Sequence, residues 1–182
     1  VLLENGTDVN AVQIDNATAL HLAVEKGHAD VAKVLIQNGA DVNAVTSSKW
    51  PVLFYAAGGG HADVAKVLIL NGADVNAGSE GGDMALHWAA YYGYVGVVKL
   101  LLQNDADVNA VDGFKRSALH SAAEHGEVDV AKVLIRNGAD VNAVEEDKKT
   151  ALHCAAAEGH VDFAYVLIRN DADVNAVDGC ER

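Results

Sequence analysis

Apolar residues recur along the chain at the spacing of short amphipathic helices. In the stretch 18–50, Leu20, Ala23 and Val24 form one stripe with i, i+3, i+4 spacing. Thr18, just before this stripe, is a suitable N-cap because its hydroxyl can accept a hydrogen bond from a free backbone N–H. The pattern therefore predicts a helix that begins directly after Thr18.

A second short helix follows in the same stretch. Gly27 separates the two helices, and the second begins near Ala29. Its apolar stripe consists of Val31, Val34 and Leu35. Gly39 ends it, because glycine adopts the left-handed conformation that closes many helices. The polar stretch 40–49 is too short for a third helix and favours an extended turn or hairpin.

This pattern returns every 33 residues without insertion or deletion. The string Asp-Val-Asn-Ala occurs six times, with its asparagine at Asn10, Asn43, Asn76, Asn109, Asn142 and Asn175. A partial unit, holding the end of a second helix and a hairpin, and five complete units therefore have the predicted bounds 1–17, 18–50, 51–83, 84–116, 117–149 and 150–182. Helices of about eight to ten residues are marginal alone, so neighbouring units must stack to bury their apolar stripes. We predict one all-α solenoid domain.

The repeated residues resemble the ankyrin repeat family. The resemblance is carried by Thr-Ala-Leu-His-Leu-Ala at 18–23, Gly-His at 27–28 and Asn-Gly-Ala-Asp-Val-Asn-Ala at 38–44, and it covers the whole chain. It implies stacked helix–turn–helix repeats joined by β-hairpin loops, with the repeats serving as an interaction surface. The family has many unrelated partners, so the resemblance does not select one function among them.

Several glycines typical of the family are replaced in this chain. The turn glycine two residues before the Thr-Ala-Leu-His motif is kept as Gly82. In the other units its position is held by Asn16, Lys49, Lys115 and Lys148. The glycine after the second helix is replaced by Asp105 and Asp171. Because side chains other than glycine disfavour left-handed backbone, we expect strain at the lysines in particular.

Composition and charge exclude several classes of protein. The formal net charge is −13, from 13 basic and 26 acidic residues, which argues against a nucleic-acid-binding protein because lysine and arginine supply phosphate affinity. No apolar stretch approaches the roughly 20 residues of a membrane helix, and the first residues do not resemble a signal peptide. Two cysteines, Cys154 and Cys180, cannot form a disulfide framework. We expect an intracellular, reducing location with no membrane or nucleic-acid partner.

The ends of the sequence lack polar capping repeats. The chain begins within a second helix and stops at a hairpin tip. We expect a fragment of a longer ankyrin repeat protein, with fraying of 1–17 and 176–182. End-to-end self-association through the uncovered faces is a further expectation.

No residue pattern predicts catalysis, a cofactor or a metal site. Four histidines share one repeat position: His21, His87, His120 and His153. Stacked helices lie about 8–10 Å apart, whereas zinc–nitrogen bonds are about 2 Å, so two of these histidines cannot share an ion. We expect their imidazoles to bond to local backbone or to nearby Thr and Ser hydroxyls, and Cys154 to pack as a small apolar residue. The aspartates and asparagines of the Asp-Val-Asn-Ala strings are predicted to stabilise the hairpins through hydrogen bonds. We predict that the chain is not an enzyme.

Partner binding is predicted from the resemblance and from the aromatic residues. In the family, the contact positions are the hairpin tips and the end of each first helix. Eight of the ten aromatics lie between Trp50 and Phe114, and such residues dominate interface hot spots. The predicted partner-binding residues are Trp50, Tyr91, Tyr92, Phe114, Arg116, His125, Glu80, Asp83 and Glu124. Tyr55 and Trp88 are predicted to be half-buried packing residues; unconnected surface aromatics are the alternative.

The leading hypothesis is a protein–protein interaction module that uses its concave face and hairpin tips. A partner with basic and apolar features would suit the acidic surroundings. The alternative is an engineered or reconstructed repeat scaffold with no natural partner. Variation among the second helices, such as Val-Ala-Lys-Val-Leu-Ile against Val-Val-Lys-Leu-Leu-Leu, favours a natural array.

Overall fold

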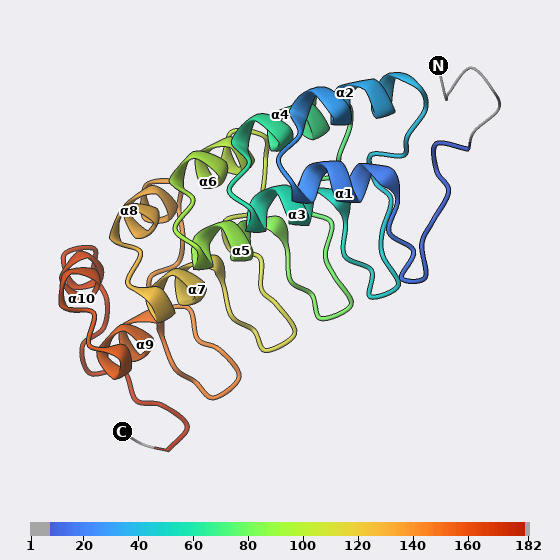
Figure 1. Ribbon diagram of the computed structural model, residues 1–182. Helices are drawn as coiled ribbons and strands as arrows, with labels where there is room; N and C mark the ends of the chain where they lie inside the picture. Colours follow the sequence, from blue (N-terminus) through green and yellow to red (C-terminus); the bar gives the residue numbers. More distant parts are fainter. Residues whose placement is uncertain (1–7, 181–182) are drawn as a thin grey trace.

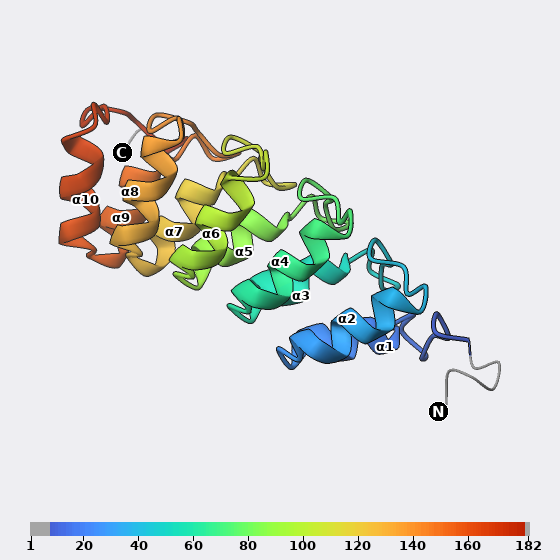
Figure 2. The ribbon, with the colours of Figure 1, turned by 90° about the horizontal axis from the view of Figure 1, so that it is seen from above.

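The helices form two parallel rows. The computed structural model describes residues 8–180 as a stack of antiparallel helix pairs (Figure 1). The inner row consists of α1 (Ala19–Glu25), α3 (Val52–Gly58), α5 (Ala85–Tyr91), α7 (Ala118–His125) and α9 (Ala151–Glu158). The outer row consists of α2 (Ala29–Gln37), α4 (Ala62–Leu70), α6 (Val95–Leu102), α8 (Val128–Arg136) and α10 (Val161–Ile168). Figure 2 shows the pairs following one another along an elongated stack, so the predicted all-α solenoid is confirmed.

Each pair begins and turns as the sequence indicates. Thr18 has extended backbone, and its hydroxyl accepts the N–H of His21 while the His21 ring accepts the N–H of Thr18. This reciprocal capping satisfies two backbone donors at the start of α1. Gly27 has a φ of +73°, which reverses the chain between α1 and α2. Local hydrogen bonds thus fix the start of α1.

Stacking buries one continuous apolar layer between the two rows. The leucines of the repeated Ala-Leu-His position, such as Leu20 and Leu119, are almost fully buried. Small residues at the next turn of the inner helices, including Ala56, Ala89 and Ala122, have no exposed surface. Full burial of one leucine contributes roughly 1.5–3 kcal/mol. Since no single pair could enclose these side chains, the core belongs to the stack.

The hairpins project beyond the ends of the helices on one side of the stack (Figure 1). Where pairing is present it is one isolated antiparallel bridge per hairpin, as between Val45 and Pro51, so the β character of these loops is minimal. An asparagine ladder joins them instead. Asn43 donates its side-chain amide to the carbonyl of Gly72 at 3.0 Å and accepts the N–H of Asp74 at 2.9 Å. The same two bonds recur at 33-residue steps, which confirms the predicted hydrogen-bonding role.

The expected left-handed turns are present without their glycines. Positive φ values between 58° and 61° occur at Asn16, Lys49, Lys115 and Lys148. Asp105 and Asp171 adopt φ values of 64° and 66° after the outer helices. The repeat geometry therefore imposes the turn even where the side chain disfavours it.

The prediction that both ends of the chain fray falls only partly on residues that the structure describes. Residues 1–7 and 181–182 lie outside them, so the predicted partial helix is not tested. Next to them, Asn10 donates to the carbonyl of Gly39, and Gly179 N–H donates to the carbonyl of Asp147. These bonds attach both described ends to the neighbouring hairpins. Fraying of 8–17 and 176–180 stays a prediction.

Candidate protein-interaction face

Three of the repeated histidines are structural parts of the stack. We refer to His21, His87 and His120, which are buried, as the buried histidines. Nδ1 of His120 accepts the N–H of Ser117, and its Nε2 lies 3.1 Å from the carbonyl oxygen of Lys149 in the next hairpin. This arrangement needs a neutral ring with its proton on Nε2. Burial lowers the pKa of all three buried histidines and so favours that neutral form.

Metal binding and cysteine chemistry are the two kinds of reactivity that the described residues allow to be examined. No group of three or more His, Cys, Asp or Glu side chains in residues 8–180 could hold a metal ion. Cys154 is partly buried, and burial raises the pKa of its thiol to about 11, with Glu145 and Glu124 adding to the effect. Such a thiol stays protonated and is a poor nucleophile near neutral pH.

An aromatic cluster lies where the second and third helix pairs meet. Its centre is Trp88 on α5, whose ring centroid lies 5.5 Å from that of Trp50 and 5.0 Å from that of Phe54. On its other side Trp88 contacts Tyr91 at 6.3 Å and Tyr92 at 5.7 Å. These separations are typical of favourable ring pairs, so the cluster is a packed surface with defined geometry.

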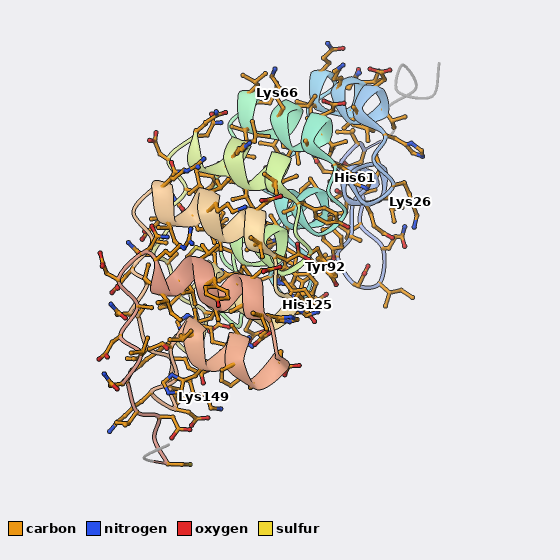
Figure 3. The ribbon with its side chains drawn as sticks, turned by 90° about the vertical axis from the view of Figure 1, so that its left-hand side faces the viewer. Lys26, His61, Lys66, Tyr92, His125 and Lys149 are labelled. Atoms are coloured by element: carbon orange, nitrogen blue, oxygen red, sulfur yellow. The ribbon has the colours of Figure 1, made fainter. Side chains whose placement is uncertain are left out.

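The cluster continues to the next repeat through a histidine. The ring centroids of Tyr91 and His125 are 3.9 Å apart, and His125 itself is exposed at the end of α7. Tyr92 is 44% exposed. Figure 3 labels Tyr92 and His125 on one side of the molecule, whereas Lys66 extends from the outer row. The aromatic surface therefore belongs to the inner row and not to the outer one.

Arg116 links this cluster to the hairpin between α6 and α7. Its guanidinium bonds to Asp112 at 2.7 Å and to Glu124 at 3.2 Å, and it lies 5.4 Å from the ring centroid of Phe114. Burial raises the pKa of Asp112, but the N–H groups of Arg116 and Phe114 together with the guanidinium outweigh burial and leave this pKa lowered. Arg116 is thus held in place by two carboxylates. Phe114 remains 62% exposed at the hairpin.

Two predicted acidic residues lie on the hairpin between α4 and α5. Glu80 is exposed at its tip, where its N–H donates to the carbonyl of Ser48 at 3.4 Å. Asp83 is half-buried and accepts the hydroxyl of Ser79 at 3.3 Å. Of the two, Asp83 lines a hollow next to the aromatic cluster.

Two hollows open between the inner helices and the hairpins. The smaller, of about 220 Å³, we call the aromatic hollow; its wall includes Trp88, Tyr91, Tyr92, Asp83, Arg116 and Glu124. The larger, of about 710 Å³, we call the acidic hollow; its wall includes Glu124, Glu145, Glu158, Asp178, Arg116 and Lys149. Arg116 and Glu124 line both, so the two hollows adjoin.

The structure gives several aromatic residues roles that differ from those predicted from the sequence. Trp88 and Tyr55 are half-buried, as expected for packing residues. Trp88 is nevertheless the centre of the cluster, a role that the sequence interpretation did not assign to it. Trp50, predicted as a contact, is half-buried against Phe54 at 4.5 Å. The signal that could have found Trp88 is the pair of large aromatics at one repeat position, Tyr55 and Trp88, 33 residues apart.

Comparison with protein families agrees with the fold and the repeat pattern. A family model for ankyrin repeats (3 copies) matches residues 1–79, 38–112 and 86–178. The chain therefore belongs to the ankyrin repeat family, as the sequence resemblance predicted. A search of curated proteins found no significant match. Within the described residues, none of the helices has the length and apolar character needed to cross a membrane.

Proposed function

We propose that the chain binds a protein partner through its inner helices and hairpins, with the aromatic cluster as the main contact. Ankyrin repeats are generally protein–protein interaction modules. The observation that carries the proposal is the gathering of large rings from successive repeats on one face, with Tyr92 44% and Phe114 62% exposed. Tyrosine and tryptophan bury much area at an interface with little loss of side-chain entropy.

The proposed contact residues have different roles. The rings of Trp50, Trp88, Tyr91, Tyr92 and Phe114 supply apolar area, and His125 extends it. Glu80, Asp83 and Glu124 add negative charge at the margin, and Arg116 fixes Glu124 in place. A net charge of −13 gives the surroundings the same sign. Such a margin favours partners with basic residues and accelerates their association.

Site-specific photo-crosslinking tests this face directly. A benzophenone amino acid replaces Tyr92 on the inner face or Lys66 on the outer row, and each variant is irradiated in cells that express the chain naturally. We expect a discrete crosslinked protein for position 92 and none for position 66. The crosslink is expected to weaken strongly when Trp50→Ala and Tyr91→Ala are combined.

Two outcomes would contradict the proposal. Equal crosslinking at both positions would show that the inner face is not the binding surface. No crosslink at either position would favour a repeat scaffold without a natural partner. Far-ultraviolet circular dichroism of each variant serves as the control for folding.

A further inference from the structure

The aromatic and acidic hollows offer different chemistry to one ligand. The aromatic hollow presents the rings of Trp88, Tyr91 and Tyr92, and at about 220 Å³ it has room for one large apolar side chain. The acidic hollow is about three times larger, and its wall includes the carboxylates of Glu124, Glu145 and Glu158 together with one arginine, one lysine and two histidines. Because Arg116 and Glu124 line both, neighbouring side chains of one short segment can reach both hollows.

The arginine and the lysine of the acidic hollow are already paired with carboxylates. Arg116 is bonded to Asp112 at 2.7 Å as well as to Glu124, so its charge is matched within the hairpin. Lys149 lies 3.8 Å from carboxylate oxygens of both Glu145 and Asp147. The hollow therefore presents an excess of negative charge to a ligand.

Burial makes the negative charge of the acidic hollow less favourable. Burial raises the pKa of Glu145, and Lys149 offsets only part of the effect. Glu158 is exposed at the margin and adds to the same field. A cation placed in the hollow would relieve the repulsion among these carboxylates, whereas an anionic ligand would increase it.

We infer that the partner segment carries adjacent apolar and cationic side chains. The apolar side chain occupies the aromatic hollow, and an arginine or lysine occupies the acidic hollow. This inference rests on the proposed function and specifies the chemistry of the partner at that face. The expected ligand of this surface is a basic, apolar polypeptide and not an acidic one or a second copy of the chain.

Tryptophan fluorescence provides a label-free test. Trp50 and Trp88 are the two tryptophans of the chain, and both belong to the aromatic cluster. The probe is an acetylated peptide, Gly-Leu-Arg-Gly-Leu-Arg-Gly, compared with counterparts that carry glutamine or glutamate in place of arginine. We expect the arginine peptide to bind roughly tenfold more tightly than the glutamine peptide. Its affinity is expected to fall as salt is raised from about 50 to about 500 mM, because salt screens the attraction.

Matched variants test whether the arginine of the peptide binds in the acidic hollow. Glu124→Gln combined with Glu158→Gln removes two charges from the acidic hollow and is expected to abolish most of the preference for arginine. Asp63→Asn combined with Asp162→Asn removes the same charge from exposed positions on the outer row and is expected to change it little. Tyr92→Ala is expected to weaken the arginine and glutamine peptides alike, because it removes apolar surface.

Several outcomes would overturn the inference. Equal binding of the three peptides would do so, as would an equal loss in the control variant. A fluorescence change on dilution of the protein alone would assign the face to a second copy. If crosslinking at Tyr92 captures a partner whose attached segment is acidic, the proposed function stands and this inference fails.

Discussion

Replacing the left-handed lysines of the hairpins with glycine is expected to stabilise the fold. Lys49, Lys115 and Lys148 have φ between 58° and 61°, and all three side chains are exposed. Their N–H groups donate to the carbonyls three residues earlier, which a glycine would still do. The substitution therefore changes backbone strain without removing a structural hydrogen bond.

The magnitude follows from two opposing contributions. A left-handed residue other than glycine costs about 1–2 kcal/mol, and glycine gives up about 0.5–1 kcal/mol through the larger entropy of its unfolded chain. The net gain is roughly 0.5 kcal/mol for each site. The sites lie in different hairpins, so the triple variant is expected to gain about 1.5 kcal/mol. For a chain of this size that gain raises the melting temperature by roughly 3–6 °C.

The same exchange within a helix provides a control of opposite sign. Lys66 is exposed in the middle of α4, where Lys66→Gly is expected to cost about 1 kcal/mol. Urea denaturation followed by circular dichroism measures both variants, and Lys→Asn at the three hairpin sites controls for the lost charge. A triple glycine variant no more stable than the parent chain would refute the argument from strain.

Three further predictions concern acid, thiol chemistry and the asparagine ladder. Because burial lowers the pKa of the buried histidines, the unfolded chain binds more protons than the folded one below pH 6.5. The free energy of unfolding is therefore expected to fall as the pH is lowered, by up to about 1.4 kcal/mol per pH unit for each of these histidines. Denaturation curves that coincide at pH 7 and pH 5 would contradict this. With a thiol pKa of about 11, Cys154 is expected to react with an aromatic disulfide reagent much more slowly than the exposed Cys180, and mass spectrometry of the labelled chain identifies which reacts first. Asn109→Ala removes two hydrogen bonds between hairpins and is expected to cost about 1–2 kcal/mol in urea denaturation, with an unchanged midpoint as the contrary result.

The sequence predicted the frame well because each part of the frame depends on local chemistry. The stripe beginning at Leu20, the cap at Thr18 and the turn at Gly27 are properties of a few consecutive residues, and the 33-residue period repeats them. The left-handed lysines were predictable for the same reason, since the repeat requires that backbone conformation whatever side chain is present.

The candidate site was less predictable because it depends on contacts between repeats. The period gives the position of Trp88 on its own helix but not the direction of its ring relative to Trp50 and Phe54. Phe54 replaces the histidine of the repeated motif and is buried, which brings Trp50 onto its ring and reduces its exposure. Similarly, Glu145 lines the acidic hollow together with Arg116 because the hairpin between α8 and α9 lies beside the preceding one, which no local pattern encodes.

The asparagine ladder has a consequence for how such a molecule changes its length. Asn76 bonds to the main chain at Asp105 and Asp107, one repeat further on, and so contacts atoms that every repeat offers in the same positions. An added or deleted 33-residue unit therefore meets the same donors and acceptors at both junctions. The proposed binding face can grow or shrink in whole steps through gene duplication or loss, while the proposed contact side chains vary independently of the joints.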